Sequence, residues 1–215
     1  MRADRVTEPG VVTRFRREGE LLLRLSHPNI VRAYEIGDTP IPYLLEEAIS
    51  GNTLASLLGR RGLGWDDLLN LADQLTAALA YLHDQNILHL DLKPSNIIAE
   101  AGRAKLIDFN LAHCPALGPA DWGTPGYFAP EQELGGMFST ATDVWGLGVV
   151  LKEAAGRRVP AKFRDLMDRC QAADPSDRPT VAEFRAYLAT CLGQPHFTSS
   201  VADDAPVAAA LAGCT

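Results

Sequence analysis

The sequence predicts an α+β fold in which helices predominate and short strands lie mainly in the N-terminal half. Leucines recur every three or four residues from Asp66 to Gln85, which is the period of an amphipathic helix. The apolar run from Thr142 to Ala155 predicts a second, buried helix. The segments Ile30–Gly37 and Pro42–Ala48 are joined by turn residues and predict a pair of strands.

The remaining elements follow from the same periodicities. Val11–Leu25 carries apolar side chains at helical spacing, and the His27–Asn29 turn ends that helix. Thr180 and Glu183 form a capping box at the start of the last predicted helix. In chain order, the other predictions are a loop opening a short helix at Ser50–Leu54, a strand–loop–strand unit at Asn86–Glu100, a strand at Ala104–Phe109, a long ordered loop at residues 110–131, helices at Ala161–Ala172 and Val181–Leu192, and a disordered tail at residues 194–215.

The composition is that of an ordinary globular protein. Of the 215 residues, 47% are hydrophobic and 22% are charged, and the formal net charge is −7. An acidic chain is a poor ligand for nucleic acid or for an anionic membrane, so we expect neither partner. The cysteines form no CxxC pair, and we find neither a signal peptide nor a membrane-spanning run. These features predict a cytoplasmic protein with reduced thiols.

A group of polar residues in the middle of the chain has the types and spacing that phosphoryl transfer requires. That reaction needs a carboxylate to accept the proton of the attacking hydroxyl, a cation near the transferred phosphate, and oxygen ligands for magnesium. Asp91 fits the first role and Lys93 the second, while Asn96 and Asp108 fit the role of metal ligands. Burying these groups without a ligand would cost on the order of several kcal/mol, which favours a functional over a purely structural interpretation.

Motifs along the chain resemble those of the eukaryotic-type, or Hanks-type, protein serine/threonine kinases of bacteria. HLDLKPSN (His89–Asn96) resembles the catalytic loop of that family, and DFN (Asp108–Asn110) resembles its magnesium-binding DFG motif. The resemblance extends from Phe15 to about Leu192. It also includes RFRREGELLLRLSHPNIV, YLLEEAISGNTL, GTPGYFAPE, DVWGLGVVL and DPSDRPT, in the family's order.

The resemblance implies a kinase-like fold with ATP and Mg²⁺ as cofactors and a protein substrate modified on Ser or Thr. Residues 48–193 would form a mainly helical large lobe. Residues 1–47 would form an incomplete small lobe that keeps the family's C-helix and its fourth and fifth strands but lacks the first three strands. In the family pattern, Glu18 pairs with a strand lysine, and the main chain around Glu47 and Ile49 binds adenine. Glu131 pairs with Arg178 in the same pattern.

The N-terminus departs from the family pattern, because no glycine-rich loop and no lysine precede Lys93. One explanation is that the coding frame begins upstream and Met1 is internal. The other is that the truncation is real, and a partner chain completes the small lobe. We expect the first, because a helix laid on two strands would expose a sheet edge and an apolar face.

Further departures concern regulation and nucleotide binding. Leu90 replaces the arginine that clamps a phosphorylated activation segment in the family, and residues 111–123 contain no Ser, Thr or Tyr. We therefore expect no switching by phosphorylation of this segment. Asn110 replaces the glycine of DFG, where its tolerance of left-handed torsions should limit the damage. Glu46 aligns with the back of the adenine pocket, where it would meet a cation or weaken nucleotide binding.

Three functions compete at this point. The first is a protein serine/threonine kinase that uses Asp91 as its base. The second is a pseudokinase, a regulatory interaction module that keeps the large lobe without catalysis. The third is a small-molecule phosphotransferase of the aminoglycoside type, which the GTPGYFAPE segment and Arg178 argue against.

Overall fold

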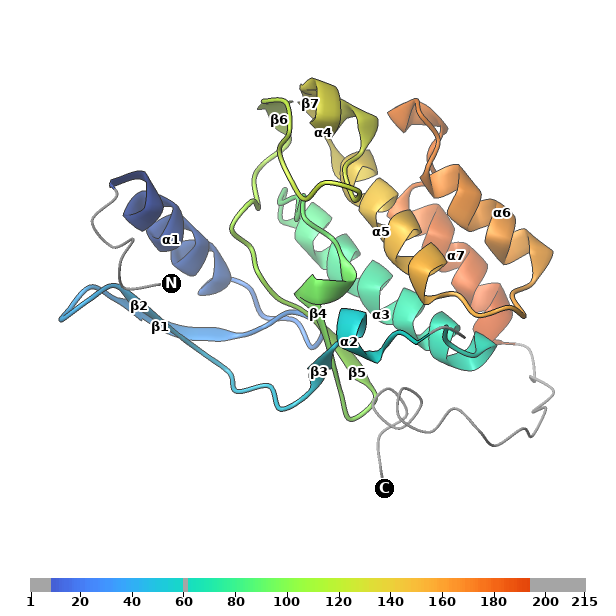
Figure 1. The fold of residues 1–215 in the computed structure, drawn as a ribbon, viewed down its shortest axis with the longest axis horizontal. Helices are drawn as coiled ribbons and strands as arrows, with labels where there is room; N and C mark the ends of the chain where they lie inside the picture. The colour runs from blue at the N-terminus through green and yellow to red at the C-terminus, as the bar shows by residue number, and fades with distance from the viewer. Residues whose placement is uncertain (1–8, 60–61, 194–215) are drawn as a thin grey trace.

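The computed structural model describes residues 9–59 and 62–193, and it confirms the predicted α+β fold. In Figure 1 the N-terminal helix and two strands lie on one side, and most of the other helices pack together on the other. The tail predicted for residues 194–215 lies outside the described residues. None of the described helices has the length and apolar character that crossing a bilayer requires. The longer helices are α1 (Pro9–Leu22), α3 (Trp65–Asp84), α5 (Thr140–Ala154), α6 (Ala161–Cys170) and α7 (Val181–Leu192).

Short antiparallel sheets connect these helices. The predicted N-terminal pair of strands forms one sheet, β1 (Ala33–Gly37) with β2 (Tyr43–Glu46). A second sheet has the order β3-β4-β5, and a third pairs β6 with β7. The bounds of these strands are Asn52–Thr53 for β3, Ile97–Glu100 for β4, Arg103–Leu106 for β5, Ala116–Gly118 for β6 and Gly136–Phe138 for β7.

Helix α1 packs closely on the β1–β2 sheet at Gly19. A Cβ atom on Gly19 would lie 2.3 Å from Cδ1 of Ile36, so a larger residue would require the Ile36 side chain to shift. The helix was predicted to reach Leu25, but it ends at Leu22. The amides of Arg24 and Leu25 donate to carbonyls three residues back, which tightens the chain into a turn before the His27–Asn29 segment.

The core of the larger, helical part surrounds α3. Its leucine stripe is fully buried, α5 and α7 pack on α3, and α6 packs on α5 (Figure 1). The Phe163 ring meets Trp65 edge-on with centroids 5.0 Å apart and meets Phe184 at 5.9 Å. The predicted capping box at Thr180 is present, with Oγ1 accepting from the amide of Glu183 at 3.1 Å. The periodicity of the sequence thus located these helices to within a few residues.

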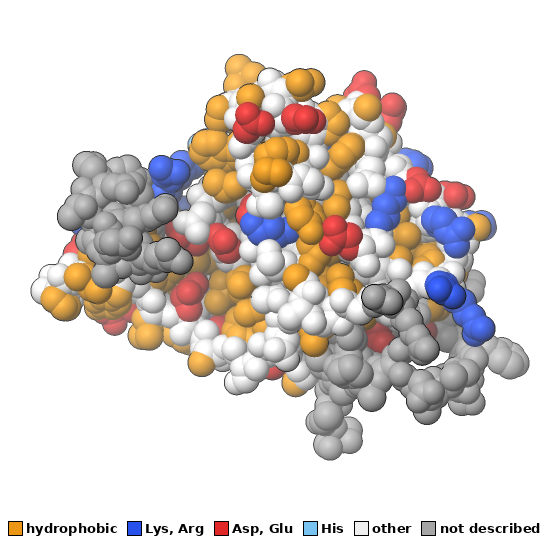
Figure 2. Space-filling model, viewed as in Figure 1, with side chains coloured by type: hydrophobic (Ala, Val, Ile, Leu, Met, Phe, Trp, Pro, Cys, Tyr) orange, Lys and Arg blue, Asp and Glu red, His pale blue; other side chains and the backbone are white. Residues whose placement is uncertain are grey.

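The loop predicted at residues 110–131 contains more structure than its Gly and Pro content indicated. Its strand β6 pairs with β7, and the short helix α4 (Pro130–Leu134) lies between them in the chain. Gly118 is required here, because a Cβ atom would lie 1.9 Å from the ring of Phe138. Figure 2 shows apolar side chains gathered at the top of the molecule over these elements. Leu117, Leu134 and Met137 are exposed there.

The strand predicted at the start of Asn86–Glu100 is wrong, although its second strand forms β4. Leu88 makes only an isolated antiparallel bridge to His113. Leu90 then adopts a left-handed φ of 64°, which is incompatible with a continuing strand. The chain passes through a single 3₁₀ turn at Pro94–Asn96 before β4 begins. Another such turn, Pro175–Asp177, precedes Arg178, and the predicted short helix is α2 (Leu54–Leu57).

A buried ion pair joins α4 to the segment before α7. Arg178 donates to both carboxylate oxygens of Glu131, at 2.7 and 2.8 Å, as the family pattern implied. The guanidinium also donates to the carbonyls of Ala141 and Ala172 and lies 5.0 Å from the ring centroid of Trp145. The Arg178 side chain is fully buried, so these partners replace the water that would otherwise stabilise its charge.

Replacing Arg178 with Ala is expected to destabilise the protein by about 3–5 kcal/mol, because Glu131 would keep a buried charge without a partner. Urea unfolding followed by circular dichroism measures the change. The exposed Arg158 provides the matched control, and Arg158→Ala should stay within about 0.5 kcal/mol of the wild type. Equal losses in the two variants would contradict this account of the ion pair.

Candidate active site

The loop that carries Asp91 is held by one buried carboxylate, that of Asp143 on α5. Asp143 accepts from the backbone amides of His89 and Leu90, at 3.0 and 2.8 Å, and from Nε2 of His83 at 2.9 Å. Burial raises the pKa of Asp143, but the hydrogen bond and charge of His83 outweigh it and bring the pKa below its ordinary value. The carboxylate is therefore ionised, and it fixes the backbone of the loop.

The catalytic residues predicted from the sequence lie in one hydrogen-bonded network. Lys93 Nζ donates to Oδ2 of Asp91 at 2.6 Å. Asn96 Nδ2 donates to the backbone carbonyl of Asp91 at 3.0 Å and to its Oδ2 at 3.1 Å. Thr124 joins the network from a distant segment, with its hydroxyl donating to Oδ1 of Asp91 at 2.6 Å and accepting from Lys93 at 2.6 Å. A carboxylate, a cation and a hydroxyl are thus in mutual contact.

His89 links this loop to the segment that carries Asp108. Its Nδ1 accepts from the amide of Asp91 at 3.3 Å, and its ring lies against Phe109 with centroids 4.8 Å apart. Burial lowers the pKa of His89 against the raising effect of the Asp143, Asp91 and Asp108 carboxylates. The buried ring is therefore neutral and acts in packing and positioning, as its place in the sequence indicated.

A cavity of about 380 Å³ adjoins this network, and the residues expected to bind nucleotide line it. Val31, Ile49, Ile98 and Ile107 are its apolar lining residues, and the other lining residues are polar or acidic. The amide of Ile107 donates to the carbonyl of Asn96 at 2.9 Å, which ties the cavity to the loop of Asp91. The lining includes Glu18, Glu46, Glu47, Ile49 and Asp108.

Glu47 and Ile49, whose main chain is expected to bind adenine, differ in their hydrogen bonds. The amide of Glu47 donates to the carbonyl of Arg32 at 2.9 Å, and its side chain accepts from Lys105 Nζ at 2.6 Å. Ile49 lines the cavity, and its backbone makes no hydrogen bond to any described residue. Burial raises the pKa of Glu47, but its bonds to Lys105 and Arg32 bring the pKa below the ordinary value.

The carboxylates of Glu18, Glu46 and Asp108 also line the cavity. Glu18 Oε1 accepts from the amide of Phe109 at 3.1 Å, which joins α1 to the segment of Asp108. Burial and the Asp108 carboxylate raise the pKa of Glu18 to about 7. Burial and the same carboxylate also raise the pKa of Glu46. Within residues 9–59 and 62–193, neither Glu18 nor Glu46 forms an ion pair with a lysine or arginine.

The residues predicted to bind magnesium have the chemistry of a hard-cation site. Asn96 uses its Nδ2 toward Asp91, and no described residue donates to its amide oxygen. Asp108 accepts from Asn110 Nδ2 at 2.6 Å through Oδ1, and its other oxygen has no donor in the described part of the chain. Carboxylate and amide oxygens are the ligands that Mg²⁺ prefers, so the residues present fit the ion.

Asn110 takes a different role from the one expected. It was expected to use the left-handed torsions that glycine has in DFG. In the structure the left-handed φ belongs to Asp108, at 65°, and not to Asn110. Asn110 instead holds the Asp108 carboxylate through its side chain. The asparagine therefore fixes the orientation of a predicted metal ligand.

Leu90 belongs to a small apolar cluster separate from the main core. It is 4% exposed and packs with Leu88 and Phe138, with Leu111 and Trp122 at the edge. Gln132 completes this region, because its Nε2 donates to the carbonyls of Leu90 and Trp122 at 2.9 and 2.7 Å. The position where the family carries an arginine is thus filled by hydrophobic packing that joins the catalytic loop to residues 111–138.

Sequence reasoning placed Thr124 in the GTPGYFAPE motif but did not predict its contact with Asp91, and it missed Gln132 as part of the site. Thr124 was the first hydroxyl residue after Asn110, which is a signal that could have drawn attention to it. Gln132 had no such signal, because its contacts depend on how the loop of residues 110–131 folds back. All of the predicted catalytic and nucleotide-binding residues lie either in the Asp91 network or in the adjoining cavity.

Comparisons with known proteins identify the family of the chain. The family described as protein kinase domain matches residues 2–163. The chain is 34% identical over 170 residues to serine/threonine-protein kinase PrkC of Bacillus subtilis, covering 74% of this chain and 26% of that protein. It is 35% identical over 167 residues to serine/threonine-protein kinase PknA of Mycobacterium tuberculosis, covering 72% of this chain and 39% of that protein. The chain thus spans between a quarter and two-fifths of the length of these relatives.

The raised pKa of Glu18 predicts a specific pH dependence of stability. Since Glu18 titrates near pH 7 when folded and near 4.5 when unfolded, folding favours its protonated form. The contribution of Glu18 to the free energy of unfolding is therefore present below pH 4.5 and is lost as the pH rises toward 7. Glu18→Gln should therefore reduce the fall in unfolding free energy across that interval, as measured by urea titrations. Glu20→Gln, an exposed neighbour on α1, should leave the slope unchanged, and a slope in Glu18→Gln equal to that of the wild type would contradict the assignment.

Replacing Leu90 with Arg is expected to destabilise the protein by about 3–5 kcal/mol, because the cluster offers the guanidinium no partner. Leu90→Met conserves volume and should cost less than about 1.5 kcal/mol. Urea unfolding of both variants measures the difference. An arginine variant as stable as the methionine variant would show that the cluster opens to solvent.

Proposed function

Since this chain belongs to the protein kinase family, we propose that it transfers the γ-phosphoryl group of ATP to serine or threonine hydroxyls of a protein substrate. The contact between Asp91 and a threonine hydroxyl carries the proposal. Thr124 presents its hydroxyl to the Asp91 carboxylate at 2.6 Å, with Lys93 bound to both groups. An incoming substrate hydroxyl needs the same acceptor and the same neighbouring cation.

In the proposed reaction, Asp91 orients the substrate hydroxyl and receives its proton. The hydroxyl oxygen forms a bond to the γ-phosphorus while the bond from that phosphorus to the bridging oxygen of ADP breaks. Lys93, which is 17% exposed in its side chain, turns from Asp91 and Thr124 toward the charge on the transferred group. Asn96 keeps Asp91 in place through two hydrogen bonds and offers its free amide oxygen to a metal ion.

The adjoining cavity is the proposed site for the nucleotide. The unpaired backbone of Ile49 and the main chain of Glu47 would meet the adenine edge, and the apolar walls would cover its faces. Asp108 and Asn96 would hold Mg²⁺, which when bound neutralises phosphate charge and orients the phosphates. The carboxylates of Glu18 and Glu46 repel a polyanion, so we expect nucleotide binding to depend strongly on the cation.

We place the reaction in the cytoplasm, where ATP is available and where cysteines remain reduced. The cysteines in the described residues are all free thiols. The substrate protein is defined only by a serine or threonine hydroxyl that can reach Asp91.

Asp91→Asn tests the proposal directly. Removing the proton acceptor should lower the rate of Mg²⁺-dependent phosphate transfer by about 10²–10⁴-fold, the usual contribution of a general base. Binding of a fluorescent ATP analogue should change little, because Asp91 lies outside the residues that line the nucleotide cavity.

Asp84→Asn is the matched control, since Asp84 is exposed at the end of α3. Its rate should equal that of the wild type. Indistinguishable rates for Asp91→Asn and wild type would exclude catalysis by this chain. Binding without transfer in every variant would leave the interaction module as the function.

A further inference from the structure

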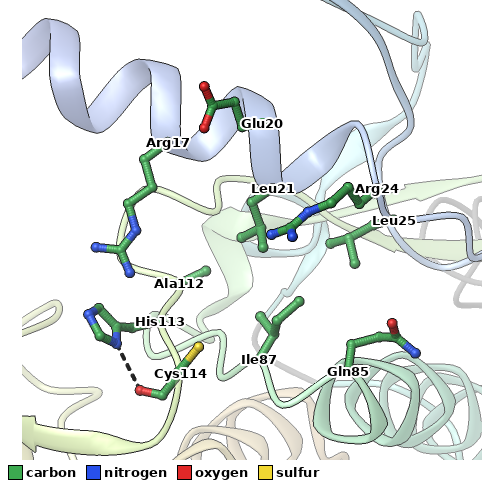
Figure 3. Close-up of a pocket in the computed structure, with 10 residues that line it drawn as sticks. All are labelled: Arg17, Glu20, Leu21, Arg24, Leu25, Gln85, Ile87, Ala112, His113 and Cys114. Carbon is green, nitrogen blue, oxygen red and sulfur yellow. Dashed lines mark hydrogen bonds between the residues drawn. The ribbon is translucent and has the colours of Figure 1, made fainter.

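A second cavity, of about 500 Å³, lies on a different face of α1 from the nucleotide cavity. Figure 3 shows its walls, with α1 above, the end of α3 below and residues 112–114 opposite. Its volume is in the range of sites that bind small organic molecules. None of the residues assigned to catalysis or nucleotide binding lines it.

The charged groups of this second cavity favour an anion. Arg17 projects toward the cavity from α1 and Arg24 from the turn that follows α1, whereas the carboxylate of Glu20 points away from it (Figure 3). Neither guanidinium has an ion-pair or hydrogen-bond partner among residues 9–59 and 62–193. Two unpaired guanidinium groups that line one cavity can bind a phosphate or carboxylate with charge-assisted hydrogen bonds.

The floor of the second cavity is apolar. Leu21, Leu25, Ile87 and Ala112 line it, and each is less than 9% exposed. His113 stands at the edge with its Nδ1–H donating to the carbonyl of Cys114 at 2.8 Å, which fixes its ring. A ligand that fills this space therefore needs an apolar body as well as an anionic head.

We propose that this second cavity binds a small amphiphilic anion, with its phosphate or carboxylate on Arg17 and Arg24 and its hydrocarbon part on Leu21, Leu25 and Ile87. The position suggests the effect of binding. Helix α1 already contacts the segment after Asp108 through Glu18 and the amide of Phe109. A ligand between Arg17 and Ala112 bridges the same two parts of the chain a second time, and it should stabilise their contact.

The experiment is a titration of the full chain, labelled at its leucine, isoleucine and valine methyl groups, with hexyl phosphate. Saturable NMR shifts are expected at Leu21, Leu25 and Ile87. Hexan-1-ol and inorganic phosphate, which each lack one half of the ligand, should bind at least about tenfold more weakly. Shifts confined to Val31, Ile98 and Ile107 would place the probe in the nucleotide cavity and overturn the proposal.

Charge reversal provides the decisive comparison. The Arg17→Glu/Arg24→Glu double variant should bind hexyl phosphate at least about tenfold more weakly than the wild type. Arg158→Glu, an exposed reversal on the loop between α5 and α6, should bind as the wild type does. The milder Arg17→Gln/Arg24→Gln pair keeps the test valid if the reversed variant fails to fold.

Equal affinities in all variants, or equal binding of hexan-1-ol, would overturn the anion site. The test needs no phosphate transfer, so its outcome is separate from that of the proposed kinase activity. Asp91→Asn should bind hexyl phosphate with unchanged affinity, whichever way the transfer assay turns out.

Discussion

The candidate active site depends on the buried carboxylate of Asp143. A charge without solvent is costly unless hydrogen bonds replace the lost water, and here the loop amides and His83 do so. The loop therefore cannot relax without exposing that charge to an apolar interior. Leu90 has a strained, left-handed φ of 64°, and the hydrogen bond from its amide to Asp143 offsets that strain. The position of Asp91, and through it those of Lys93 and Asn96, follows from this constraint.

The activation segment, residues 111–123, is held in place by packing where related kinases would use charge. An arginine and a phosphate attract one another strongly but only when the phosphate is present. The Leu90 cluster and the β6–β7 pairing require no modification. Gln132 adds polar contacts between the two sides of this packing. Leu90 and the lack of hydroxyl residues at positions 111–123 accord with a segment whose packing needs no phosphate.

Much of the fold and part of the site could be predicted from the sequence, for different reasons. The bounds of α7 matched, and α3 differed by one residue at each end, because leucine period and capping chemistry are local signals. The spacing of Asp91, Lys93 and Asn96 is likewise local. The β6–β7 pairing, the Thr124 contact and the high pKa of Glu18 depend on segments brought together only by the fold. No pattern within either segment specifies them.

The Asp143 contacts also determine when the site can form. They join residues separated by 53 to 60 positions in the chain, so loop closure precedes any gain in energy. A chain emerging from the ribosome contains the whole HLDLKPSN motif well before α5 has been synthesised. Until α5 docks on α3, the loop amides lack their acceptor. The loop of Asp91 can therefore take its observed conformation only after α5 has been synthesised and has docked on α3.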